Sequence, residues 1–230
     1  MAAIAHGLNS GTFTVVQLVQ THLDQIARFN GALRAVLQVN PNTLAIARAL
    51  DAEMADPEHR RLRPLHGVPL LVKDNIVTSE PALEATAGSL ALLGAKPARE
   101  NAAVTRLREA GCVLLGTTNC SGWASSRTRP SDNGWSARGG QTYGTYHERQ
   151  DPFGSSSGSG VAVDIGFCLK PTTGLVSRDA VVPISPAQDT LGPMARSVGD
   201  AAIMLKIMAG RDEHDSKTGR DPDGDGLRLW

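Results

Sequence analysis

The chain of 230 residues carries 23 basic and 23 acidic side chains, so its formal net charge is zero. This balance argues against a basic nucleic-acid surface and against an acidic interaction tail. No apolar run approaches the length of a membrane-spanning helix, and the first residues lack the basic flank and apolar core of a signal peptide. We therefore expect neither nucleic acid nor a membrane as a partner of this chain, whose length suits one large domain or the front part of a larger one.

The first third of the chain alternates helical and strand patterns. Apolar residues at helical spacing predict an amphipathic helix over residues 14–28. Asn40-Pro41 predicts an N-cap followed by proline at the first helical position, so that a second helix runs to about Met54. An apolar run with β-branched residues at 65–72 predicts a buried strand, and Lys73 stands at its end.

The middle of the chain continues this alternation. Residues 101–111 predict a helix closed by a glycine, and residues 112–115 predict the next buried strand. Helices followed by strands favour α/β layering. The irregular stretch 121–160 contains tryptophan and tyrosine, which are unusual in disordered linkers, so we expect an ordered binding loop there.

The last part of the chain has one further helical pattern, over residues 199–210. It completes a domain that we place at residues 1–212. The charged, glycine-rich residues 213–230 are expected to form a disordered tail.

The three cysteines, Cys112, Cys120 and Cys168, are odd in number and show no Cys-x-x-Cys spacing. They predict free thiols in a reducing compartment, which we take to be the cytoplasm, rather than a disulfide framework. No local feature marks a catalytic cysteine, so buried structural thiols are the favoured interpretation.

Two features could carry chemistry. Lys73, at the end of an apolar strand, is expected to be partly desolvated, which disfavours the ammonium and can leave an amine able to take a proton from a hydroxyl. A lysine exposed just past the strand end is the plainer alternative. The glycine-rich loop around Ser155-Ser156-Ser157 offers hydroxyls as nucleophile or relay. A flexible linker is the alternative there, and a phosphate-cradling loop is a weaker one because no Gly-Lys-Ser/Thr follows.

Other polar groups give weaker signals. His66 and His147 have no partner at metal-ligand spacing, so no zinc site is predicted. The run 221–226 matches the opening of a calcium-binding loop but lacks the glutamate at its twelfth position, so no calcium site is predicted. The arginines that could hold a carboxylate, or more simply face solvent or hold loops together, are Arg127, Arg129, Arg138 and Arg178.

Several runs of the sequence resemble, in order, motifs of the amidase signature family, and within it the peptide amidases. The resemblance covers residues from about 10 to 212. Besides the serine loop, the runs are Gly67-Val-Pro-Leu-Leu-Val-Lys73-Asp74-Asn75, Ala87-Gly-Ser-Leu-Ala-Leu, Arg108-Glu-Ala-Gly-Cys-Val-Leu-Leu-Gly-Thr-Thr-Asn119, Gly134-Trp-Ser-Ala-Arg-Gly-Gly-Gln-Thr142, Lys170-Pro-Thr-Thr-Gly-Leu-Val-Ser-Arg178 and Gln188-Asp-Thr-Leu-Gly-Pro-Met-Ala-Arg196.

The family hydrolyses carboxamides with a Ser-Ser-Lys triad, without a cofactor or metal. Its lysine is the base, a serine that follows a cis peptide bond relays the proton, and a second serine attacks the carbonyl carbon. The resemblance implies Lys73 as the base and Ser156 as the relay serine, with Ser155 and Ser157 as neighbouring candidates. It also implies a mixed central β-sheet covered by helices, a small-molecule or peptide amide as substrate, and a substrate-binding loop that includes Gly154, Gly158, Gln141 and Thr142.

In one place the sequence departs from that family. There, a longer segment with a Gly-Thr-(Asp/Glu)-x-(Gly/Asp)-Gly-Ser motif lies between the serine loop and the Lys-Pro-Thr turn and supplies the nucleophile and the oxyanion donors. Here Lys170 follows Gly158 by only twelve residues, and no serine lies between Ser159 and Lys170. We therefore find no nucleophile. Because the family also continues well beyond the position that Asp212 matches, we expect an incomplete fold of marginal stability.

Three functions follow as hypotheses. The first is an amide hydrolase. The nucleophile and the oxyanion donors are missing from this chain, so we expect it to have little or no activity. The second is a non-catalytic remnant or pseudoenzyme that acts as a binding protein. The third, much weaker, is a phosphate or nucleotide binder that uses the glycine- and serine-rich loop.

Overall fold

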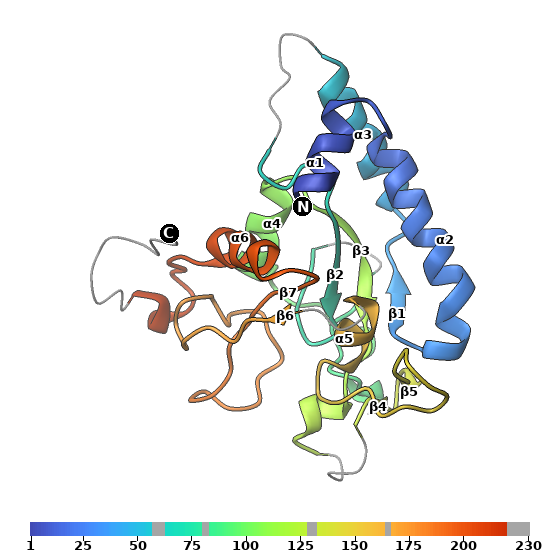
Figure 1. Cartoon of the computed structure of the whole chain (residues 1–230). Helices are drawn as coiled ribbons and strands as arrows, with labels where there is room; N and C mark the ends of the chain where they lie inside the picture. The colour runs from blue at the N-terminus through green and yellow to red at the C-terminus, as the bar shows by residue number, and fades with distance from the viewer. Residues whose placement is uncertain (57–62, 80–82, 128–132, 164–166, 220–230) are drawn as a thin grey trace.

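The structure is a computed structural model that describes residues 1–56, 63–79, 83–127, 133–163 and 167–219 (Figure 1). Arg129 and the run 221–226 lie outside the described residues. The α-helices are α1 (Ala2–Asn9), α2 (Val15–Leu33), α3 (Thr43–Ala55), α4 (Ala102–Glu109), α5 (Ser157–Val163) and α6 (Val198–Met208). The strands are β1 (Val36–Val39), β2 (Pro69–Lys73), β3 (Val113–Thr118), β4 (Trp135–Ser136), β5 (Gly140–Gln141), β6 (Phe167–Cys168) and β7 (Met194–Ala195). Three 3-10 turns complete the set: η1 (Leu90–Leu92), η2 (Gly122–Ser125) and η3 (Ser216–Gly219).

Helix α2 confirms the first helical prediction and extends it to Leu33. Its start is fixed by a capping box: Thr14 Oγ1 accepts a hydrogen bond from the Gln17 backbone N–H at 3.1 Å, and Gln17 Oε1 accepts one from the Thr14 N–H at 2.9 Å. It ends at Arg34, whose backbone is left-handed (φ 50°).

Helix α3 begins later than the sequence predicts. Asn40 is not its N-cap, because the Asn40 side chain accepts a hydrogen bond from the Asn42 N–H at 2.8 Å and donates one to the Leu114 carbonyl at 3.0 Å. The helix starts at Thr43, whose hydroxyl donates to the Asn40 carbonyl at 2.6 Å. A tertiary contact to β3 therefore overrides the local capping signal.

The central sheet has the order β1–β3–β2, with β1 antiparallel and β2 parallel to β3. This mixed sheet confirms the α/β fold class. The predicted strand at 65–72 is shifted to Pro69–Lys73, because residues 64–67 form the turn that leads into it. In the register of the parallel pair, Lys73 lies opposite Thr118, so both strands end at the same edge of the sheet.

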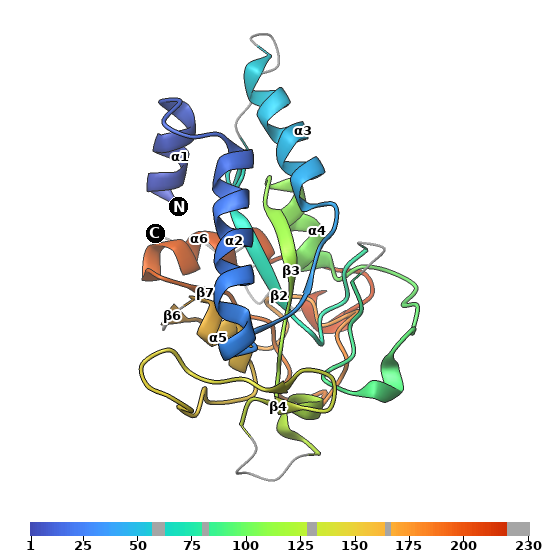
Figure 2. The same ribbon diagram turned by 90° about the vertical axis from the view of Figure 1, so that its right-hand side faces the viewer.

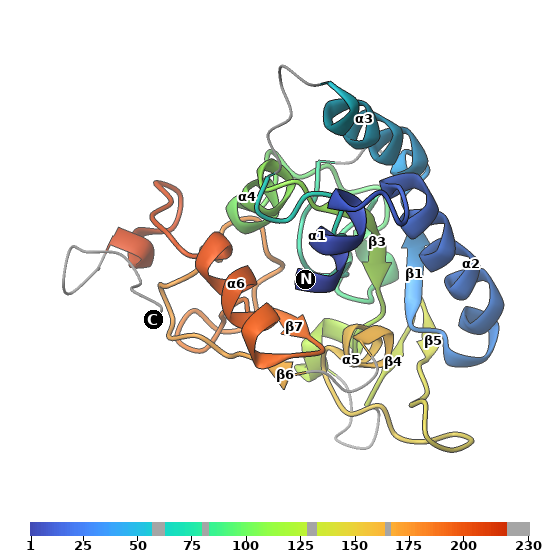
Figure 3. The ribbon, with the colours of Figure 1, turned by 45° about the horizontal axis from the view of Figure 1, so that its top comes forward.

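The alternation of side chains along the strands produces two apolar cores. Leu70, Val72 and Leu114 face α4 and α6, whereas Val113 and Leu115 face α2 and α3. Figures 1 and 3 show α4 and α6 on one side of the sheet and α2 with α3 on the other, and Figure 2 views the sheet from the α2 and α3 side. Helices thus cover both faces of the sheet.

The segment around residues 121–160 is largely ordered, as expected, and returns to the sheet through α5, which contacts β2 and β3. The helix predicted at 199–210 is observed as α6, with Ser197 as its N-cap, accepting a hydrogen bond from the Asp200 N–H at 3.1 Å. Residues 213–219 differ from the expected disordered tail. They turn through η3, and Asp215 is buried against Arg178.

Candidate active site

The end of β2 brings Lys73 to the serine-rich loop. Lys73 Nζ donates a hydrogen bond to Ser155 Oγ at 2.8 Å, across 82 residues of sequence. The peptide bond between Gly154 and Ser155 is cis. A basic amine and an aliphatic hydroxyl therefore meet in the geometry that proton transfer between them requires.

Backbone contacts fix the serine loop on the strand ends. The Ser121 N–H donates to the Ser155 carbonyl at 3.0 Å, and the Gly158 N–H donates to the Asn119 carbonyl at 2.9 Å. The hydroxyls of Thr118 and Ser159 are 2.6 Å apart. Since β3 ends at Thr118, the loop and α5 are held by the strand that also pairs with the lysine strand.

The structure bonds Lys73 to a different serine from the one that the sequence favoured. Sequence matching implied Ser156, whereas Lys73 Nζ donates its hydrogen bond to Ser155. Ser157 is buried, and its hydroxyl donates to the Phe153 carbonyl at 2.5 Å, so it points away from the lysine. Three consecutive serines give no sequence signal that distinguishes them, because the choice depends on the backbone path.

Two residues of the expected substrate-binding loop make close contacts within the fold. A Cβ added at Gly158 would lie 2.2 Å from the Ala35 carbonyl oxygen, so this glycine allows α5 to approach the backbone of two other segments. Thr142 is fully buried, and its hydroxyl donates to the Arg34 carbonyl at 2.8 Å. Both residues are buried in the described structure.

The other two residues of that expected loop behave differently. Gln141 Nε2 donates to the Asn133 and Thr142 carbonyls at 2.7 and 2.9 Å, so it holds the loop together. Gly154, by contrast, is exposed beside Ser155. Of the four expected positions, only Gly154 lies at the surface next to the Lys73–Ser155 pair.

Burial lowers the pKa of Lys73 below its ordinary value of 10.5. Negative charge that Cys120, Asp189 and Cys168 would carry acts in the opposite direction, but burial dominates. Burial also raises the pKa of Cys120 to about 12, which keeps that thiol neutral at physiological pH. At a given pH, Lys73 is therefore more often a neutral amine than a solvated lysine is, and a neutral amine can act as a general base.

A buried ion pair supports the residue next to the lysine. Asp74 is fully buried and accepts hydrogen bonds from Arg138 at 2.9 Å, from the Gly88 N–H at 2.8 Å and from the Thr86 hydroxyl at 2.5 Å. Arg138 also binds Glu84 at 2.9 Å. Burial raises the pKa of Asp74, against the effects of these three donors. Nothing in the sequence distinguishes Arg138 from the other arginines, whereas in the structure it pairs with Asp74 at the end of the lysine strand.

Two other arginines of that set are also placed. Arg178 binds Asp215 through two nitrogens, at 2.9 and 2.7 Å, and holds the last described turn to the domain. Arg127 lies over the Trp123 ring at 5.1 Å. The expectation that arginines hold loops together is confirmed for Arg138 and Arg178.

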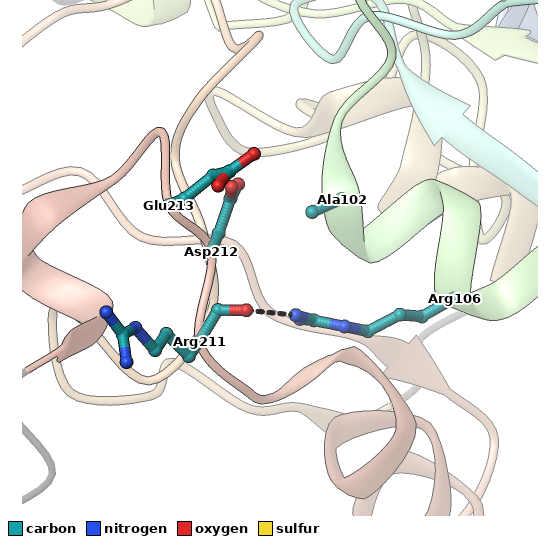
Figure 4. Close-up of a pocket in the computed structure, with 5 residues that line it drawn as sticks. All are labelled: Ala102, Arg106, Arg211, Asp212 and Glu213. Atoms are coloured by element: carbon teal, nitrogen blue, oxygen red, sulfur yellow. Dashed lines mark hydrogen bonds between the residues drawn. The ribbon is translucent and has the colours of Figure 1, made fainter.

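Two hollows of the described structure lie away from the Lys73–Ser155 pair. One, of about 460 Å³, is lined by Ala102, Arg106, Arg211, Asp212 and Glu213, and Figure 4 shows Arg106 reaching the backbone oxygen of Arg211 at 2.7 Å. The other, of about 230 Å³, lies beside Arg178 and Asp189. Neither hollow is lined by Lys73 or Ser155. Within the described ranges, no three His, Cys, Asp or Glu side chains gather as a metal site, and no helix is long and apolar enough to cross a membrane.

Comparison with known proteins identifies relatives over nearly the whole chain. The family model described as Amidase matches residues 17–169 and 167–225. A putative amidase of Arthroderma benhamiae is 44% identical over 92% of this chain and 39% of its own length, and a putative amidase of Schizosaccharomyces pombe is 40% identical over 96% and 42%. The solved peptide amidase of Stenotrophomonas maltophilia superposes with a TM-score of 0.89 at 43% identity, covering 96% of this chain and 50% of that one. The chain thus spans half or less of the length of these relatives.

The same comparisons contain a gap. The alignment with the Schizosaccharomyces pombe protein has 250 positions but covers 96% of 230 residues, about 221, so about 29 positions hold no residue of this chain. The two matches to the family model meet at residues 167–169. This junction lies four residues after Val163, the last residue of α5, close to the point where the sequence departs from the motif order.

Proposed function

This chain belongs to the amidase family, and we propose that Lys73 and Ser155 are the proton-transferring half of a centre that hydrolyses carboxamide C–N bonds. The observation that carries this proposal is the 2.8 Å hydrogen bond between the two side chains. The likeness to a peptide amidase supports a small-molecule or peptide amide as the substrate of the whole centre.

The roles of the two residues follow from their chemistry. Neutral Lys73, whose pKa burial lowers, accepts a proton from the Ser155 hydroxyl. Ser155 in turn accepts the proton of an attacking serine hydroxyl and later returns it to the leaving nitrogen. In this proposal Ser155 takes the relay position that the sequence had suggested for Ser156.

The attacking serine is the part that this chain lacks. The sequence contains no serine between Ser159 and Lys170, and both the gap of about 29 positions and the break in the family match support a missing segment after Val163. Removing one oxyanion donor costs about 10²–10³ in rate, and removing a catalytic nucleophile costs about 10⁶. We therefore expect this chain alone to hydrolyse amides no faster than background.

The same gap favours a second candidate, a non-catalytic remnant or pseudoenzyme that acts as a binding protein. The transcript across residues 163 and 164 discriminates between the two. An in-frame segment with a Gly-Gly-Ser or Gly-Asp-Gly-Ser motif would return the protein to the hydrolases, and an uninterrupted junction would favour the remnant.

A chimera tests the proposed roles. Residues 1–163 of this chain are joined to the peptide amidase of Stenotrophomonas maltophilia from its matching position onward, and ammonia release from a C-terminally amidated dipeptide is measured. We expect turnover that falls by about 100-fold or more in Lys73→Met and Ser155→Ala, and by much less in Ser156→Ala. A chimera with a cooperative melt but no turnover, or one that depends on Ser156 rather than Ser155, would contradict the assignment.

A further inference from the structure

We propose that in this chain Ser155 is itself the nucleophile of a two-residue Ser–Lys centre, which accepts acyl groups from activated esters rather than from amides. The inference rests on the proposed role of Lys73 as base. It differs from that role in making Ser155 the attacking atom instead of a relay.

Ser155 is the half-buried serine of the loop that is bonded to the lysine; Ser156 is also half-buried but makes no such bond to Lys73. Gly154, which precedes Ser155, is exposed, and Phe153, two residues before Ser155, is 77% exposed. Ser157, in contrast, is 1% exposed and already donates to a carbonyl.

A backbone donor stands beside this hydroxyl. Among the described residues, none accepts a hydrogen bond from the Ser156 N–H. The Ser155 carbonyl accepts a hydrogen bond from the Ser121 N–H at 3.0 Å. In acyl-transfer enzymes the N–H of the residue after the nucleophile is a common oxyanion donor. The Ser156 N–H therefore provides one donor for a developing oxyanion, and the tie to Ser121 fixes the turn that presents it.

The ester reaction balances with these two side chains and water. Ser155 Oγ bonds to the carbonyl carbon as its proton passes to the neutral Lys73 amine, and the bond to the aryloxide breaks, with the electron pair leaving on the phenolate oxygen. The Lys73 ammonium then loses that proton to bulk water and becomes a neutral amine again. A water molecule gives a proton to this amine as it attacks the acyl carbon. Ser155 Oγ departs and takes that proton from Lys73, which releases the carboxylic acid.

The leaving group explains why esters and not amides are the substrates. An aryloxide leaves as an anion, whereas an amine must receive a proton on nitrogen before the C–N bond breaks. In a centre with two serines the relay serine can deliver that proton. When Ser155 is the acylated residue, only the Lys73 ammonium is left to deliver that proton, so we expect amides to react far more slowly than aryl esters.

Covalent labelling of the intact chain tests the inference. The 230-residue protein is treated with a fluorophosphonate, whose fluoride leaves as an anion, and the modified residue is located by fragment mass spectrometry; release of p-nitrophenolate from p-nitrophenyl acetate is measured in parallel. We expect the adduct on Ser155. Both rates should fall by about 100-fold in Lys73→Met, whereas Lys96→Met, at an exposed lysine, should leave them unchanged.

The outcomes separate this inference from the proposed function. An adduct on Ser156 or Ser157, no adduct on a protein that shows a cooperative melt, or labelling of Ser155 that persists in Lys73→Met would overturn the inference. Ser155→Ala provides a second check, since it should abolish labelling even if Lys73→Met fails to fold. An active chimera combined with an unlabelled chain would refute the ester chemistry alone and leave the amidase role intact.

Discussion

Replacing Arg138 by methionine should be among the most damaging single changes near the site. The arginine side chain is 10% exposed and its partner Asp74 is 0% exposed, so the substitution leaves a carboxylate buried without its cation. Loss of one member of a buried pair costs about 3–5 kcal/mol, which is a large fraction of the roughly 5–15 kcal/mol that stabilises a typical domain. Because Asp74 directly follows Lys73, the same change should loosen the end of β2.

The assay is equilibrium unfolding in urea at pH 7, followed by circular dichroism. Arg63→Met is the matched control, because the Arg63–Glu53 pair is 35% and 41% exposed and such pairs contribute about 0–1 kcal/mol. The double variant Arg138→Met/Asp74→Asn no longer contains the buried, unpaired carboxylate, so its free energy of unfolding should exceed that of Arg138→Met by about 1 kcal/mol or more. If Arg138→Met lost no more stability than Arg63→Met, the ion pair would not support the strand as described.

Three further predictions follow from contacts in the same structure. Gly158→Ala should destabilise the protein by about 1–3 kcal/mol or more, because the new Cβ would lie 2.2 Å from the Ala35 carbonyl oxygen. The control is Gly160→Ala in the same helix, whose Cβ meets nothing within 4 Å and which should stabilise the protein by about 0.5–1 kcal/mol. Equal shifts of the melting temperature in the two variants would contradict the close packing at Gly158. The hydrogen bonds from Arg178 lower the pKa of Asp215 to about 2, so its contribution to stability, roughly 2 kcal/mol, should be present above pH 4 and lost as the pH falls toward 2; a difference between wild type and Asp215→Asn that does not shrink over this range would oppose it. The rate of fluorophosphonate labelling should rise with pH and reach half its maximum below 10.5, since burial lowers the pKa of Lys73 despite the opposing effects of Cys120, Asp189 and Cys168; a midpoint at or above 10.5 would argue against a buried base.

The position of the lysine could be predicted from the sequence because it depends on a local pattern. An apolar run followed by Lys73 indicates a buried strand with a polar end, and the structure places Lys73 at the last position of β2. The helices α2, α4 and α6 could also be predicted from the sequence, because their apolar residues repeat at helical spacing.

The partner of the lysine could not be chosen among three adjacent serines. The hydrogen bond to Ser155 depends on how the loop crosses the end of β3, where Ser121 binds its carbonyl. That path is set by contacts between segments far apart in sequence, which no local pattern records. For this reason the sequence favoured Ser156, whereas the structure bonds Lys73 to Ser155.

The ion pair beside the site was not predicted from the sequence, for a similar reason. Asp74 and Arg138 are 64 residues apart, and the sequence treats Arg138 as one of several loop arginines. Thr142 was expected at a substrate, yet its hydroxyl binds the carbonyl of Arg34 across 108 residues. Polar residues in an irregular segment can serve a ligand or the fold, and only their tertiary partners decide between the two.

The decisive experiment measures ammonia release from an amidated dipeptide side by side for this chain and for the chimera that adds the remaining part of a peptide amidase. We expect background release by the chain alone, and turnover by the chimera that Lys73→Met and Ser155→Ala each lower by about 100-fold or more. Turnover by the chain alone that depends on Lys73 would contradict the claim that its attacking serine is missing.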